Sequence, residues 1–146
     1  VVVAEGDLRQ FVSFGPDAEE QPAAEQTLPV NNSLFAPGSQ DADIYWRVET
    51  AGAVATPLAA IVRFHTETEA VDGVGGRGEV LVVIRLAADG NGGVCHVGYI
   101  DGQANSDAMV LAERVADSNA AGFDCAAMEP KVYGAAGAGP SSIGGD

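Results

Sequence analysis

The chain has only two cysteines, and their positions constrain the fold more than any other feature of the sequence. Cys95 opens a strand-like run, Val94–Ile100, and Cys125 follows a helix-like run that ends near Gly122. A strand of this length spans roughly 23 Å, and a helix over residues 105–121 spans about 25 Å. A helix folded back along the strand would bring Cys125 close to Cys95. We therefore predict a disulfide that clamps a β-α unit, with two separate buried thiols as the alternative.

A paired set of cysteines with none left over is typical of an oxidising compartment. The chain begins with Val1 rather than Met, which fits a signal peptide or anchor removed upstream. We expect a periplasmic or extracellular protein. No run of about twenty apolar residues is present, so we predict no membrane span in this chain.

Charge and length narrow the classes of partner and fold. The 146 residues fit one domain, and 21 acidic against 7 basic residues give a net charge of −14. Such a surface repels nucleic-acid phosphates and anionic lipids, so neither is an expected partner. The simplest interpretation of the negative charge is that it keeps the protein soluble. A more specific interpretation is that it attracts a positively charged protein partner. The core should be rich in Ala and Val, with the larger side chains of Tyr45, Trp46, Phe64, Tyr99 and Phe123.

The first 43 residues are predicted to form an irregular N-terminal arm. Residues 15–43 contain Pro16, Pro22, Pro29 and Pro37, too many for an internal helix or a central strand. The arm either wraps the domain or is a mobile linker. In both cases it is a candidate partner-binding segment, with four apolar anchors: Leu28, Val30, Leu34 and Phe35.

Residues 44–130 carry the regular pattern. Strand-like runs are expected at 44–48, 58–65, 79–86 and 94–100, followed by a helix over 105–121 that is capped by Asn105 or Ser106. This order predicts an α+β fold: an antiparallel meander of three to four strands packed by one C-terminal helix. The Gly- and Ala-rich tail, 131–146, is expected to be extended or flexible.

Strand alternation argues against a catalytic cysteine. On a regular strand Cys95, Val97 and Tyr99 share one face, which the helix would cover, and His96 and Gly98 share the other. His96 therefore cannot readily activate the neighbouring thiol, and a disulfide would remove the nucleophile. We predict no catalytic residues and no cofactor.

One set of side chains could bind a metal. His65, Glu67 and Glu69 alternate, so an extended strand projects all three from one face, where they could gather a divalent cation. The alternative is that the strand extends into solvent here and that these three side chains are polar only because they are exposed.

Several segments together resemble a known group of proteins. They are Tyr45-Trp46-Arg47, 82–86, 95–101, 112–117 and Phe123-Asp124-Cys125. The chain is similar, over 43–130, to an uncharacterised family of small secreted bacterial proteins with a Cys-His-Val strand and a second Cys after an Ala-rich helix. This resemblance implies export and a disulfide, and it implies no activity.

We therefore expect a non-enzymatic exported binding or structural subunit that docks on a larger envelope or extracellular assembly. One alternative is a small-ligand or metal-binding enzyme or carrier that uses His65, Glu67, Glu69 or His96. Another is an acidic inhibitor of a basic protein target.

Overall fold

The structure, a computed structural model, describes residues 1–36, 38–71, 74–86 and 93–136, with backbone only for 68–71 and 74–75. Along the chain its elements are β1 (Val2–Gly6), β2 (Arg9–Ser13), the 3₁₀ helices η1 (Ala18–Glu20) and η2 (Pro22–Glu25), β3 (Asn31–Ser33), β4 (Ile44–Ala51), β5 (Val54–Val71), β6 (Val74–Arg85), β7 (Cys95–Asp101), α1 (Ala108–Asn119) and β8 (Lys131–Val132). The fold is α+β, as predicted, with more strands than the sequence indicated.

The centre of the fold is a mixed six-stranded sheet. Strands β4 to β7 follow one another as antiparallel neighbours, which is the expected meander. The long strand β5 also pairs with β3, and β8 adds to β7 in parallel. Strands β1 and β2 form a separate hairpin. The four extra strands have five residues or fewer, so their sequences carry little periodic signal.

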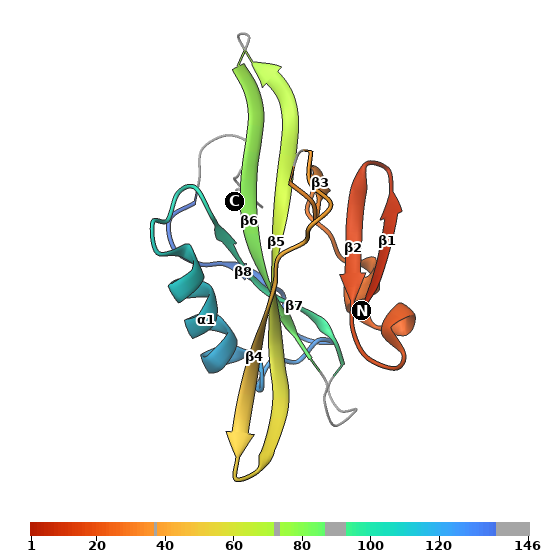
Figure 1. Ribbon diagram of the computed structural model, residues 1–146, viewed down its shortest axis with the longest axis vertical. Coiled ribbons are helices and arrows are strands. Elements are labelled where there is room, and N and C mark those ends of the chain that lie inside the picture. Colours follow the sequence, from red (N-terminus) through yellow and green to blue (C-terminus); the bar gives the residue numbers. More distant parts are fainter. Residues whose placement is uncertain (37, 72–73, 87–92, 137–146) are drawn as a thin grey trace.

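The sheet is covered on both faces, as Figure 1 shows, with α1 on one side and the N-terminal segment on the other. We call these the helix face and the arm face. The helix-face core consists of Ala59, Ile61, Leu81, Val83, Cys95, Val97, Ile100, Ala108, Ala112, Val115, Ala116, Ala120 and Phe123. The arm-face core consists of Val12, Phe14, Ala23, Leu28, Leu34, Ala60, Val62, Phe64, Val80, Val82, Ile84 and Val94.

The N-terminal segment is not the irregular arm that the prolines indicated. It forms strands β1, β2 and β3, and Pro22 takes the first position of η2, where a missing N–H costs nothing. Two glutamines attach it to the edge of β7: Gln21 Oε1 accepts a hydrogen bond from the Val94 N–H, and Gln26 Oε1 accepts one from the His96 N–H. The segment is therefore a covering layer of the domain.

Strand β7 contains a β-bulge that changes which residues share a face. The pairing with β6 shifts between Val83 and Ile84, whose partners are Gly98 and His96, so Val97 is an extra residue. The predicted alternation is wrong beyond this point. Ile100 rather than Tyr99 joins the helix-face core, and Tyr99 packs against the arm-face core. His96, which pairs with Ile84, lies on the arm face as expected.

The helix is shorter than predicted, running over Ala108–Asn119, and neither Asn105 nor Ser106 is its N-cap. At its other end, Arg85 Nη1 donates hydrogen bonds to the carbonyls of Ala120 and Ala121. These bonds place a cation where the helix dipole favours one.

Cys95 and Cys125 form a disulfide with a Cα–Cα distance of 5.9 Å. It joins the first residue of β7 to the segment that follows α1. The expected tail is ordered at its start, because β8 pairs with Gly98 and Tyr99. The rest of the predicted tail, 137–146, lies outside the described residues.

Candidate functional site

Exposed apolar side chains gather on the hairpin formed by β4 and β5, which projects beyond the rest of the sheet in Figure 1. Tyr45, Trp46, Val48 and Val54 are 40%, 48%, 50% and 64% exposed. We call these four residues the hairpin surface. Tyr45 and Trp46 were expected in the core, as their size suggests. The structure instead puts them on an edge strand that no layer covers completely.

The outer edge of β4 has no partner strand within the described ranges. The carbonyl of Asp43 accepts a hydrogen bond from the Arg63 N–H on β5. Antiparallel strands alternate in which residues face the partner. The register shift between Arg47 and Val48 adds Leu58 to β5 and no residue to β4, so the alternation continues along β4, and the backbone groups of Trp46, Val48 and Thr50 point away from β5, toward the free side. A free row of backbone donors and acceptors is a template for another strand.

Arg47 fixes this hairpin to the helix. Its Nε and Nη2 atoms donate to the two carboxylate oxygens of Asp117, at 3.0 and 2.7 Å, and its Nη1 atom donates to Glu113 at 2.8 Å. The hydrogen bond from Arg47 lowers the pKa of the Asp117 carboxyl. Because these groups are largely exposed, the pairs contribute orientation more than stability.

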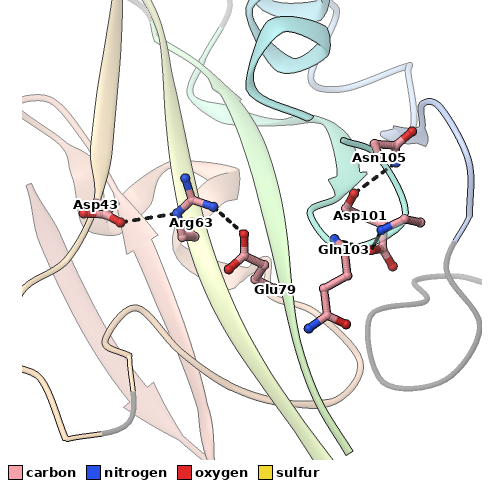
Figure 2. Close-up of polar contacts among 7 residues, drawn as sticks. Asp43, Arg63, Glu79, Asp101, Gln103 and Asn105 are labelled. Atoms are coloured by element: carbon pink, nitrogen blue, oxygen red, sulfur yellow. Dashed lines mark hydrogen bonds and ion pairs between the residues drawn. The ribbon is translucent and has the colours of Figure 1, made fainter. Parts of the chain in front are cut away.

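A second anchor lies at the base of the hairpin. Figure 2 shows Arg63 of β5 between Asp43, which precedes β4, and Glu79 of β6. The guanidinium carbon of Arg63 also lies 6.0 Å from the centre of the Tyr45 ring. One side chain thus joins β5, β6 and the segment that leads into β4.

The loop between β7 and α1 is ordered by Asp101 and Asn105. Asp101 Oδ1 accepts hydrogen bonds from the Gln103 and Ala104 N–H groups, and Asn105 Nδ2 donates to the Asp101 carbonyl (Figure 2). Asn105 also exchanges two hydrogen bonds with the backbone of Ala135. These contacts are structural, since they fix the loop and the segment after β8.

His96 is fully buried, and its Nδ1 atom lies 2.9 Å from the Tyr99 hydroxyl. The Nε2 atom has no hydrogen-bond partner. Burial lowers the pKa of His96 to about 3, and it raises the pKa of Tyr99 to about 12, with a further contribution from Glu129. His96 is therefore a neutral core residue. The sequence missed its contact with Tyr99, because the bulge that creates it leaves no compositional signal.

The residues predicted to bind a metal lie at the other end of β5. His65 and Glu67 line an open polar cavity of about 710 Å³ together with Asn31, Ser33 and Arg77. Their register partners on β6 are Glu79 and Arg77. The side chain of Glu69 lies outside the described residues. Among the described side chains, no group of three or more His, Cys, Asp or Glu residues is arranged to hold a metal ion.

The four apolar anchors predicted for partner binding are part of the domain itself. Leu28 and Leu34 are each 1% exposed within the arm-face core, Phe35 packs against that core, and Val30 is half-buried. Of the two arrangements expected for the arm, the wrapping one is present. Leu28 and Leu34 cannot contact a separate partner unless the covering layer opens.

No protein-family model matches the chain, and no curated protein or solved structure is significantly similar to it. These comparisons add no family to the resemblance noted from the sequence. The described helix is too short and too polar to cross a membrane.

Proposed function

We propose that this protein is a non-enzymatic exported binding subunit, which docks on an extended segment of a larger protein through the free edge of β4. The observation that carries the proposal is the edge itself. Its outward backbone groups have no partner strand within the described ranges, and exposed apolar side chains flank them on both faces of the strand. Main-chain hydrogen bonds of an added strand supply affinity, and pockets for alternate side chains supply specificity.

The rigidity of the edge supports the same function. Arg47 ties β4 to α1, and Arg63 ties the base of the hairpin to β6. A strand that is already held in its binding conformation loses little entropy when a partner is added. This feature favours a preformed docking site.

Charge indicates the chemistry of the partner. Asp41 and Asp43 precede β4 and Glu49 lies within it, on a chain with a net charge of −14. An extended segment with basic side chains would be attracted to such a surface and would associate faster at low salt. The Cys95–Cys125 disulfide supports a periplasmic or extracellular location for the complex.

A variant at the centre of β4 tests this function. In Val48→Pro the outward N–H is replaced by a proline ring, which an edge strand tolerates but an added strand cannot pair with. Val48→Thr keeps the N–H and a β-branched side chain, and is the matched control. The tagged wild-type protein and Val48→Thr should capture the same protein from native envelope extracts, and Val48→Pro should not.

Folding of each variant is checked first by near-ultraviolet circular dichroism. If folded Val48→Pro captures the same protein as wild type, the partner does not add to β4 and the proposal is wrong. If the captured protein is a single basic enzyme in a stoichiometric soluble complex, the protein is an inhibitor rather than a subunit of an assembly.

A further inference from the structure

A second, smaller cavity lies on the arm face at the base of the hairpin. It has a volume of about 320 Å³ and is lined mainly by Phe14, Pro16, Trp46, Pro57, Leu86 and Val94. This volume is at the lower end of the range for small-molecule sites, so the cavity fits a compact ligand. Val1, Gly15, Asp17 and Gln21 complete the lining.

Two aromatic rings form a corner in this cavity. The centres of the Phe14 and Trp46 rings are 5.4 Å apart, and the ring planes are 80° to each other. Phe14 is 4% exposed and anchored in the arm-face core, whereas Trp46 is 48% exposed. The Phe14 side of the cavity is therefore fixed in the core, and the Trp46 side is open to a ligand. In this edge-to-face pair Phe14 supports the indole, and the exposed ring of Trp46 is the one available to a cation, which aromatic rings attract because their faces carry negative potential.

Asp17 provides a negative charge at the same cavity. Its carboxylate has no ion pair and no side-chain hydrogen bond within the part of the chain that the structure describes. The 3₁₀ helix that follows it, η1, contains Glu19 and Glu20, and the chain as a whole is strongly acidic. These charges disfavour an anionic ligand and favour a cationic one.

We propose that the cavity between Phe14, Trp46 and Asp17 binds a small organic cation with an alkylated ammonium group. The apolar lining desolvates the alkyl groups, the exposed ring of Trp46 contacts the charge, and Asp17 balances it. The site shares Trp46 with the hairpin surface, but its ligand would contact side chains of the arm face, whereas docking on β4 uses the backbone edge of the strand.

Trp46 is the single tryptophan of the chain, so the tryptophan fluorescence of the protein reports on ligand binding in this cavity. Choline is titrated into the folded chain at constant ionic strength, with sodium chloride as the balancing salt, and Trp46 fluorescence is recorded. The neutral isostere 3,3-dimethylbutan-1-ol is titrated in parallel. We expect choline to cause a saturable change in Trp46 fluorescence, and we expect the alcohol to bind several-fold more weakly.

Two charge variants complete the experiment. Asp17→Asn should weaken choline binding by about threefold, as for a partly exposed ion pair, and leave binding of the alcohol unchanged. Glu20→Gln removes an equal charge from the same segment but does not line the cavity, so it should weaken choline binding less than Asp17→Asn does. The proposal is overturned if choline gives no saturable change, if the alcohol binds as tightly as choline, or if both variants weaken binding equally.

Discussion

The Nδ1 atom of His96 and the hydroxyl of Tyr99 lie 2.9 Å apart inside the arm-face core, three residues apart on β7. A regular strand would put these side chains on opposite faces. The bulge at Val97 brings them together. With Nε2 unpartnered, this contact is the only hydrogen bond that the described structure gives the imidazole.

Removing the Tyr99 hydroxyl should destabilise the fold because it leaves the buried His96 imidazole without a hydrogen-bond partner. Tyr99→Phe is expected to lower the free energy of unfolding by about 1–3 kcal/mol, measured by urea denaturation at neutral pH. A double-mutant cycle supplies the control: in a His96→Leu background the same substitution should cost much less. Equal costs in both backgrounds would show that the two groups do not interact.

The burial of His96 also predicts a pH dependence of stability. The folded pKa of about 3 lies below the unfolded value of 6.5, so between these pH values the unfolded chain binds the proton and the folded chain does not. Stability therefore falls as the pH drops below about 6.5, with a slope of about 1.4 kcal/mol per pH unit from this residue. Melts of wild type and His96→Leu from pH 7 to pH 4 should show the smaller slope in the variant. Parallel curves would rule out this role.

The covering layer should depend on the two glutamines that bond to β7. Gln26→Ala removes the acceptor of the buried His96 N–H, a bond of 2.8 Å, and should destabilise the fold by about 1–3 kcal/mol. Gln40→Ala changes an exposed glutamine in the same N-terminal segment and should have little effect. Amide exchange at His96 gives a local readout, and unchanged protection there in Gln26→Ala would contradict the arrangement.

The disulfide closes a loop with a sequence separation of 30. In the chain-entropy model, this cross-link stabilises by about 3–4 kcal/mol. Replacing both cysteines by alanine should lower the melting midpoint strongly, and added reductant should lower the wild-type midpoint but not that of the variant. A wild-type midpoint that does not respond to reductant would contradict a stabilising clamp.

The sequence predicted the part of the fold that has long apolar runs. Strands β4 to β7 and the helix are visible because β-branched and aromatic runs and an amphipathic pattern specify them locally. Strands β1, β2, β3 and β8 are short, and backbone pairing with neighbouring strands decides whether they form. The bulge at Val97 depends on register between β6 and β7, and register is a tertiary property.

The candidate site was harder to predict for a similar reason. Apolar residues such as Tyr45 and Trp46 are expected inside, and only the topology shows that β4 is an edge strand. In contrast, Leu28 and Leu34 looked like anchors for a partner because prolines surround them. Tertiary packing determined which apolar segment is buried and which stays exposed.

The most direct test of the docking proposal is amide hydrogen exchange of β4, measured in the free protein and in the complex with its captured partner. The account predicts that the amides of Trp46, Val48 and Thr50 exchange fast in the free protein and become protected in the complex. The amides of Tyr45 and Arg47, which face β5, should be protected in both states. Unchanged exchange at Trp46, Val48 and Thr50 in a stable complex would contradict docking on the edge of β4.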